Sequence, residues 1–177
     1  MGPMATAEFF RRLVAGTPAL IDQEHLRVLI DNDPSVPDRT VAILHGGPSP
    51  AGVLAAMARR LENAGAELLV MPCNTAHVYI EEIRASVSIP VLDMIDETVA
   101  TIDRPSVGLL ATDGTILTGL YQRVCEARGI RVVVPDSVNQ RCVIDAVSAI
   151  KQGENSAGVE KRIGSIVGRL RDEGAEA

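Results

Sequence analysis

The residues best suited to chemistry lie in segment 71–77, which reads Met-Pro-Cys-Asn-Thr-Ala-His. It follows an apolar run at 68–71 that we predict to be a buried strand. In an open α/β fold the carboxyl end of such a strand meets the ligand-binding edge of the sheet, where we expect the Cys73 thiol. A helix that begins after it, capped by Asn74 or Thr75, would favour the anionic sulfur through its free N–H groups and its dipole. We therefore interpret Cys73 as a functional thiol rather than as a small core residue.

Three chemistries are compatible with a thiol at this position. A Cys–His nucleophile requires His77 within hydrogen-bond reach as the base, which a spacing of four residues on one helix face allows. A zinc site needs more ligands than Cys73 and His77, and the sequence offers no second pair with ligand spacing, so zinc is disfavoured. A thiolate can also act as a general base toward a carbon acid when a nearby group stabilises the resulting carbanion.

Two other motifs have simpler explanations. The segment 45–50 is glycine-rich but lacks the Lys-Ser/Thr ending of a phosphate loop, so we predict a turn before the next helix. Asp93, Asp96 and Glu97 fit the acidic first turn of a helix better than a cation site.

The elements that must position these residues follow an α/β pattern, because short runs rich in Val, Leu and Ile alternate with longer stretches of helical period. The predicted strands are 26–30, 68–71, 107–111 and 130–134, with a weaker one around Val91. The predicted helices are one that contains Phe9, Phe10 and Leu13, and those at 50–63, 116–128, 140–150 and 156–171.

Composition narrows the class of partner. Hydrophobic residues make up 46% of the chain and aromatic ones only 2%, which suits aliphatic helices packed on parallel strands. A net charge of -6 without a Lys/Arg cluster argues against binding to nucleic acid or to an anionic membrane. Neither a membrane span nor a secretory signal is recognisable, so we expect a cytoplasmic protein with a small soluble ligand.

The other two cysteines are expected to be structural. An odd count of three without a CxxC pair predicts free thiols rather than a disulfide framework. Cys125 and Cys142 both fall inside predicted amphipathic helices, where a thiol usually fills the core.

An internal similarity suggests two related halves. Residues 60–67 and 169–176 match at an offset of 109, and each reads as a helix end, a glycine and a strand start. Alone it supports a duplication only weakly. We expect the chain to cross between lobes at 103–105, which divides it into a first lobe at 1–103 and a second at 104–177. Both ends are expected to be cut where a strand belongs.

The segment 72–77 resembles the first cysteine motif of the PLP-independent aspartate/glutamate racemases, in their aspartate racemase branch. Residues 1–6 resemble the end of the family's N-terminal glycine-rich turn, 33–39 its loop with a substrate-binding arginine, and 108–115 its second-lobe strand and turn. These ordered matches extend along nearly the whole chain.

The resemblance implies an α/β fold of two pseudo-symmetric lobes, each a parallel sheet flanked by helices, with the ligand cleft between them. It implies one cysteine per lobe, on opposite faces of the substrate's α-carbon. One thiolate removes the proton and the other thiol returns one, so L- and D-aspartate (or glutamate) interconvert without PLP, metal or any other cofactor. In the family the second cysteine follows a Gly-Ala-Glu stretch like that at 174–176, and we expect that its counterpart, like the first strand, is cut off here.

Matched position by position, the resemblance makes Cys73 the catalytic base and acid of the first lobe. Asn74 and Thr75 would bind the substrate's α-carboxylate or amino group. Arg39 would clamp a carboxylate with its bidentate guanidinium fork, and the alternative is an exposed loop charge.

Three residues complete the predicted site. Thr112 and Thr115 lie on a turn at a strand end, where hydroxyls and backbone N–H groups suit a carboxylate, or serve as ordinary turn and cap residues. Lys151 resembles a family lysine that faces the side-chain carboxylate, and the alternative is a solvated charge at a helix end.

Other functions are also compatible with this sequence. Hydantoin racemisation or malonate decarboxylation would keep the fold and Cys73, and a non-catalytic carboxylate-binding protein would keep only the pocket. Arg39 and Lys151, if both face the cleft, favour a small dicarboxylic amino acid. Family members commonly form dimers, so we expect a homodimer.

Overall fold

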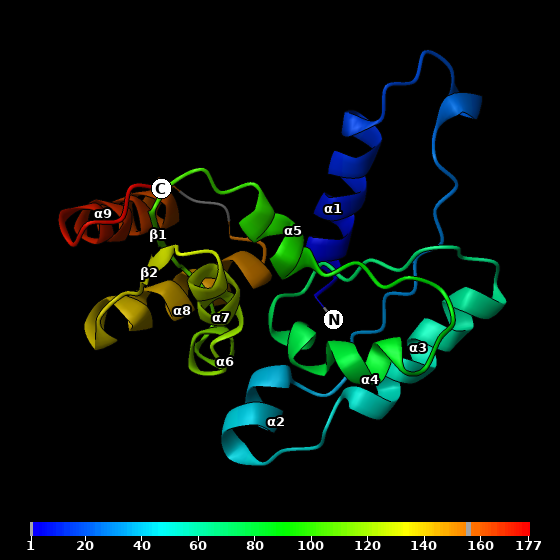
Figure 1. The fold of residues 1–177 in the computed structure, drawn as a ribbon, viewed down its shortest axis with the longest axis horizontal. Helices are drawn as coiled ribbons and strands as arrows, with labels where there is room; N and C mark the ends of the chain where they lie inside the picture. Colours follow the sequence, from blue (N-terminus) through cyan, green and yellow to red (C-terminus); the bar gives the residue numbers. More distant parts are fainter. Residues whose placement is uncertain (1, 155–156) are drawn as a thin grey trace.

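The computed structural model describes residues 2–154 and 157–177, in which helices surround very short strands (Figure 1). The α-helices are α1 (Pro3–Gly16), α2 (Arg39–His45), α3 (Ala51–Asn63), α4 (Ile80–Arg84), α5 (Met94–Ala100), α6 (Asp113–Leu117), α7 (Leu120–Ala127), α8 (Ser137–Lys151) and α9 (Ala157–Asp172). The 3-10 helices are η1 (Asp22–Glu24) and η2 (Thr75–Tyr79), and the strands are β1 (Ser106–Gly108) and β2 (Arg131–Val133).

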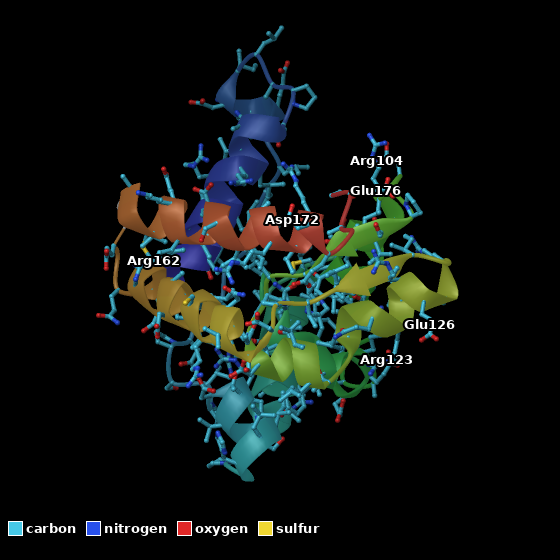
Figure 2. All side chains as sticks on the ribbon, turned by 90° about the vertical axis from the view of Figure 1, so that its left-hand side faces the viewer. Arg104, Arg123, Glu126, Arg162, Asp172 and Glu176 are labelled. Carbon is cyan, nitrogen blue, oxygen red and sulfur yellow. The ribbon has the colours of Figure 1, made fainter. Side chains whose placement is uncertain are left out.

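The strands of the second half form a small parallel sheet. β1 pairs with β2 in the register Ser106↔Arg131 to Gly108↔Val133. The end of the chain lies along the other edge of β1, because Glu176 N donates to Ser106 O at 3.1 Å and Gly108 N donates to Ala177 O at 2.7 Å. In Figure 2 Glu176 accordingly lies close to Arg104, just before β1. The strands predicted at 107–111 and 130–134 are confirmed as β1 and β2, although both are shorter.

The strands predicted in the first half are corrected. Within the described residues, segment 68–71 contributes only an isolated parallel bridge between Leu69 and Val91. Segment 26–30 forms no ladder there, and Leu26 is 62% exposed. Apolar content indicates a residue suited to a strand, but a strand exists only where a neighbouring chain accepts and donates its hydrogen bonds.

The helices follow the predicted pattern more closely. α3 matches the helix predicted at 50–63, and Leu54, Met57 and Ala58 are buried as the amphipathic stripe requires. The helix predicted at 116–128 is divided into α6 and α7 by Gly119, whose φ of 66° lies in the left-handed region. α8 and α9 correspond to the last two predicted helices, although Ser156 lies outside the described residues.

Helix α1 is present as predicted but covers little of the molecule. None of its residues is buried, and Phe9 and Phe10 are 38% and 39% exposed. Figure 1 shows α1 projecting away from the sheet and from α8 and α9.

The internal similarity has a structural counterpart. Both copies end a helix on a glycine with positive φ, 90° at Gly65 and 95° at Gly174. The residue after each glycine donates its N–H back into the helix, Ala66 to Leu61 O at 3.0 Å and Ala175 to Leu170 O at 2.9 Å. The same local hydrogen-bond pattern therefore ends α3 and α9 and directs the chain toward a parallel neighbour.

Among the described residues, buried hydrophobic side chains form three core clusters. The first core cluster lies around α3 and η2 and contains Val36, Leu54, Met57, Ala58, Leu69, Met71, Ala76 and Ile83. The second contains Ile95, Val99, Val107, Leu120 and Cys125, and the third contains Val133, Val143, Ile166, Leu170 and Ala175. Figure 2 shows α9, with Arg162 and Asp172, lying beside α8, and both helices contribute residues to the third cluster. Because α5 packs against α7 in the second cluster, the two halves share a core, and the division after residue 103 stays a prediction.

Candidate functional site

Three threonine hydroxyls from the two halves of the chain meet at one point. Thr75 Oγ1 lies 2.9 Å from Thr112 Oγ1 and 3.0 Å from Thr115 Oγ1, and the last two oxygens are 3.1 Å apart. We call this group the threonine triangle. Thr75 is 7% exposed and Thr115 is fully buried. The triangle thus joins η2, which follows the cysteine motif, to the start of α6, which follows β1.

The positions of Thr112 and Thr115 in the triangle are explained by the way in which α6 begins. Thr112 has extended backbone angles and is the N-cap of α6, where its Oγ1 accepts from Thr115 N at 3.4 Å. Thr112 and Thr115 are therefore turn and cap residues, as one alternative held, and they also belong to the junction between the halves.

A glycine allows this close approach. A Cβ added at Gly114 would lie 3.0 Å from Thr75 Cγ2 and 3.3 Å from Thr40 Oγ1. The start of α6 is thus pressed against both η2 and the first turn of α2. The first turn of α2, which also contains Arg39, therefore packs against the start of α6.

The Cys73 thiol lies immediately before this junction. Its backbone N donates to Met71 O at 2.8 Å, which makes a tight turn before η2. The residue is half-buried and packs against the edge of the first core cluster. Its sulfur is therefore neither enclosed in the core nor free on an open loop.

His77 does not serve the thiol as a base. Its Nδ1 lies 2.9 Å from the backbone oxygen of Cys73, and its Nε2 accepts from Met94 N at 3.2 Å. The ring is 2% exposed, and because both of its nitrogens are hydrogen-bonded to backbone groups it connects the cysteine turn to α5. The Cys–His nucleophile considered from the sequence is therefore wrong.

Asn74 points across to the second half instead of capping a helix. It makes no side-chain cap bond to η2, which corrects the predicted cap, and its Oδ1 accepts from Tyr121 Oη at 2.7 Å. Desolvation by burial is the main cause that raises the pKa of Tyr121, so the phenol keeps its proton at neutral pH. Sequence reasoning missed Tyr121, and the signal available was a rare aromatic residue in the helix after the Thr112 turn.

Gln140 of α8 hydrogen-bonds to the turn that carries Thr112. It is a second residue that the sequence analysis did not identify. Its Nε2 donates to Ala111 O at 3.0 Å and to Asp113 Oδ1 at 2.8 Å. Its Oε1 is buried and has no hydrogen-bond partner among the described residues. No local pattern distinguishes this glutamine from others in an amphipathic helix.

The guanidinium of Arg39 is only partly used. Its Nη1 donates to Pro37 O at 3.0 Å and to Val36 O at 3.3 Å, both in the loop before α2. Its Nε is buried without a partner in the part of the chain that the structure describes. A guanidinium with an unused donor suits a carboxylate ligand.

Lys151 is not brought to this group. It is exposed at the last position of α8, whereas Gln140, which bonds the turn of the triangle, is in the first turn. Eleven residues of α-helix separate them by roughly 16 Å.

A cavity of about 500 Å³ lies beside the junction and is lined by His77, Ile80, Asp93, Thr118, Leu120 and Arg123, among others. Neither Cys73 nor any member of the triangle lines it, so it does not define the site.

In residues 2–154 and 157–177, no three His, Cys, Asp or Glu side chains form a group suited to a metal ion. Within the same residues, no helix has the length and apolarity needed to cross a bilayer.

Comparison with known proteins gives a consistent result. The family model of Asp/Glu/hydantoin racemases matches residues 1–177. The broad specificity amino-acid racemase RacX of Bacillus subtilis is 32% identical over 160 residues, which cover 86% of this chain and 68% of that protein. The glutamate racemase of Aquifex aeolicus is 35% identical over 77 residues, which cover 41% of this chain but only 30% of that enzyme.

Solved structures agree with this fold. The aspartate racemase of Picrophilus torridus superposes with a TM-score of 0.87 at 30% sequence identity, over 97% of this chain and 73% of its own. An aspartate racemase homologue from Pyrococcus horikoshii superposes with a TM-score of 0.62 at 23% identity, over 82% of this chain and 67% of its own, and supports the fold alone.

Proposed function

Because this chain belongs to the Asp/Glu/hydantoin racemase family and is an amino-acid racemase of that family, we propose that Cys73 exchanges the α-proton of a small dicarboxylic amino acid. The observation that carries the proposal is the position of Cys73 next to Asn74 and Thr75, both of which hydrogen-bond to the second half of the chain. A thiol at such a junction lies where a ligand would contact both halves.

The proposed reaction begins with the substrate carboxylate. Asn74, the hydroxyls of the threonine triangle and the unused donor of Arg39 would bind it. The Cys73 thiolate then takes the α-proton, and the electron pair of the broken C–H bond delocalises into that carboxylate. Donors already in place stabilise the added negative charge, which lowers the barrier.

Return of the proton to the same face gives exchange without inversion. Inversion needs a donor on the opposite face of the α-carbon, and neither other cysteine in the chain is placed to provide it. Cys125 is buried in the second cluster, and Cys142 packs against the third. The resemblance assigns this second step to a cysteine of the other lobe.

We infer the substrate class from the positive charge of Arg39 and from the substrates that the relatives' names give. Arg39 can pair with one carboxylate. We propose that Lys151 pairs with the side-chain carboxylate only after the C-terminal end of α8 moves toward the ligand, because Lys151 lies roughly 16 Å along that helix from Gln140. Aspartate is the first choice because the Picrophilus torridus enzyme is an aspartate racemase, with glutamate second. We also propose that the protein is a homodimer, that it is located in the cytoplasm and that it needs no cofactor.

The test is deuterium exchange at the α-carbon of L-aspartate in D2O, followed by proton NMR, with chiral chromatography to detect inversion. Since a positioned base typically contributes 10²- to 10⁴-fold, Cys73→Ser should slow exchange by at least about a hundredfold. The matched control is Cys142→Ser, which should exchange at the wild-type rate.

Two results would contradict the proposal. Equal loss of exchange in Cys73→Ser and Cys142→Ser would remove the special role of Cys73. Tight aspartate binding without any exchange in the wild-type protein would instead identify a carboxylate-binding protein of the same fold.

A further inference from the structure

The hydroxyl of Tyr121 is hydrogen-bonded to the residue that follows the catalytic thiol. Tyr121 lies in the first turn of α7, and its Oη donates to Asn74 Oδ1 at 2.7 Å, although 47 positions separate the two residues. The ring packs against the second core cluster, which holds the hydroxyl in place. This bond is thus a fixed link between the junction and the neighbour of Cys73.

The bond determines which end of the Asn74 amide is free. An asparagine side chain has one oxygen acceptor and one NH2 group with two donors. With the oxygen occupied by Tyr121, the Nδ2 group makes no hydrogen bond to any described residue, and Asn74 is exposed. The group left open to a ligand is therefore a donor, which suits a carboxylate and not an ammonium group.

We propose that Tyr121 is a positioning residue that fixes the Asn74 amide with its Nδ2 donors toward the substrate carboxylate, beside Cys73. The inference rests on the proposed function, because it names what orients one of the carboxylate ligands of that same site. Without the phenol the amide can rotate, and its oxygen would then repel the carboxylate in part of the population. Substrate binding and stabilisation of the carbanion would weaken together.

A double-mutant cycle tests this role, with succinate as an unreactive dicarboxylate whose dissociation constant is measured by calorimetry. Because one oriented hydrogen bond to a charged group is at stake, Tyr121→Phe and Asn74→Ala should each weaken binding by about tenfold or more. If Tyr121 acts through Asn74, the double variant should bind within about twofold of Asn74→Ala alone. Tyr79→Phe is the matched control and should bind as the wild type does, because Tyr79 packs beside the first core cluster and Asn74 Oδ1 accepts from Tyr121 instead.

A second measurement separates positioning from general loss of structure. Phenylalanine keeps the ring packing, so Tyr121→Phe should unfold at nearly the wild-type temperature. In the wild-type protein the side-chain amide resonances of Asn74 should shift when succinate is added, and in Tyr121→Phe that shift should be lost or much reduced.

Different results would overturn the role of Tyr121 and the proposed function. Penalties that add in the double variant, or wild-type affinity in Tyr121→Phe, would overturn this inference and leave the proposed function intact. A wild-type protein that binds neither succinate nor aspartate overturns the proposed function and this inference together.

Discussion

The three cysteines differ in what surrounds their sulfur atoms. Cys125 is 1% exposed within the second core cluster, and desolvation raises the pKa of its thiol. Cys73 and Cys142 are half-buried, at the edges of the first and third clusters. Since the thiolate is the nucleophile, burial alone should separate Cys125 from the other two.

We therefore predict that iodoacetamide at neutral pH alkylates Cys73 and Cys142 at least about tenfold faster than Cys125, because the Cys125 thiol is shielded and resists deprotonation. Mass spectrometry of peptides over a time course measures the three rates. Added aspartate should slow Cys73 and leave Cys142 unchanged, and all three should react alike in urea. Labelling of Cys125 at the rate of Cys73 in the folded protein would show that the described burial is wrong.

At the scale of elements, side-chain caps determine where several helices begin. Asp93 accepts from two backbone N–H groups of α5, and Asp136 accepts from Val138 N and Asn139 N at the start of α8. Asn139 also donates its side-chain amide to Asp136 at 2.9 Å. These bonds, led by the one from the backbone of Asn139, hold the pKa of Asp136 below its usual value.

The stability that the Asp136 cap contributes should be lost in acid. A carboxylate whose pKa is lowered by folding stabilises the native state above its unfolded pKa, and that contribution is lost as pH falls through the folded pKa. Asp136→Asn keeps a good cap but cannot titrate, so its urea midpoint should fall less than that of the wild type between about pH 6 and about pH 3.

The control for this prediction is Asp145→Asn, an exposed position on the same helix. It should keep the wild-type pH dependence. If Asp136→Asn and Asp145→Asn behave alike, the cap of α8 contributes nothing specific in acid.

At the scale of the whole molecule, the two halves meet at the candidate site. The threonine triangle, the bond from Tyr121 to Asn74 and the packing of α2 on α6 all cross from one half to the other. We therefore predict that substrate binding depends on how closely the two halves approach each other.

Gly114→Ala tests this dependence. Its new Cβ would lie 3.0 Å from Thr75 Cγ2 and 3.5 Å from Thr40 Cα, so α6 must move away from both neighbours. We predict succinate affinity lowered at least about fivefold, with some loss of thermal stability, because the triangle is spread. Calorimetry and thermal unfolding measure the two effects.

A matched glycine provides the control. Gly164 lies in α9, and a Cβ there would meet nothing within 4 Å. Gly164→Ala should stabilise the protein by about 0.5–1 kcal/mol through helix propensity and leave affinity unchanged. Wild-type succinate affinity in Gly114→Ala would show that the approach of the halves does not control the site.

Much of this protein could be predicted from its sequence because the rules involved act over a few residues. Apolar spacing of 3.6 predicted the buried stripe of α3, and glycines predicted where α3 and α9 end. The motif around Cys73 indicated the family, since it combines a rare residue with its neighbours in a set order. The three carboxylates at 93–97 indicated a helix start for the same local reason.

Only the tertiary structure decided which side chains meet. Thr75 and Thr112 are 37 positions apart, and no local period relates them or relates Asn74 to Tyr121. Their contact depends on how whole helices and loops pack. The same packing determines that His77 hydrogen-bonds to backbone groups and not to the Cys73 sulfur. Periodicity along a chain encodes which face of an element is apolar, whereas the partner of that face is selected by packing across the molecule.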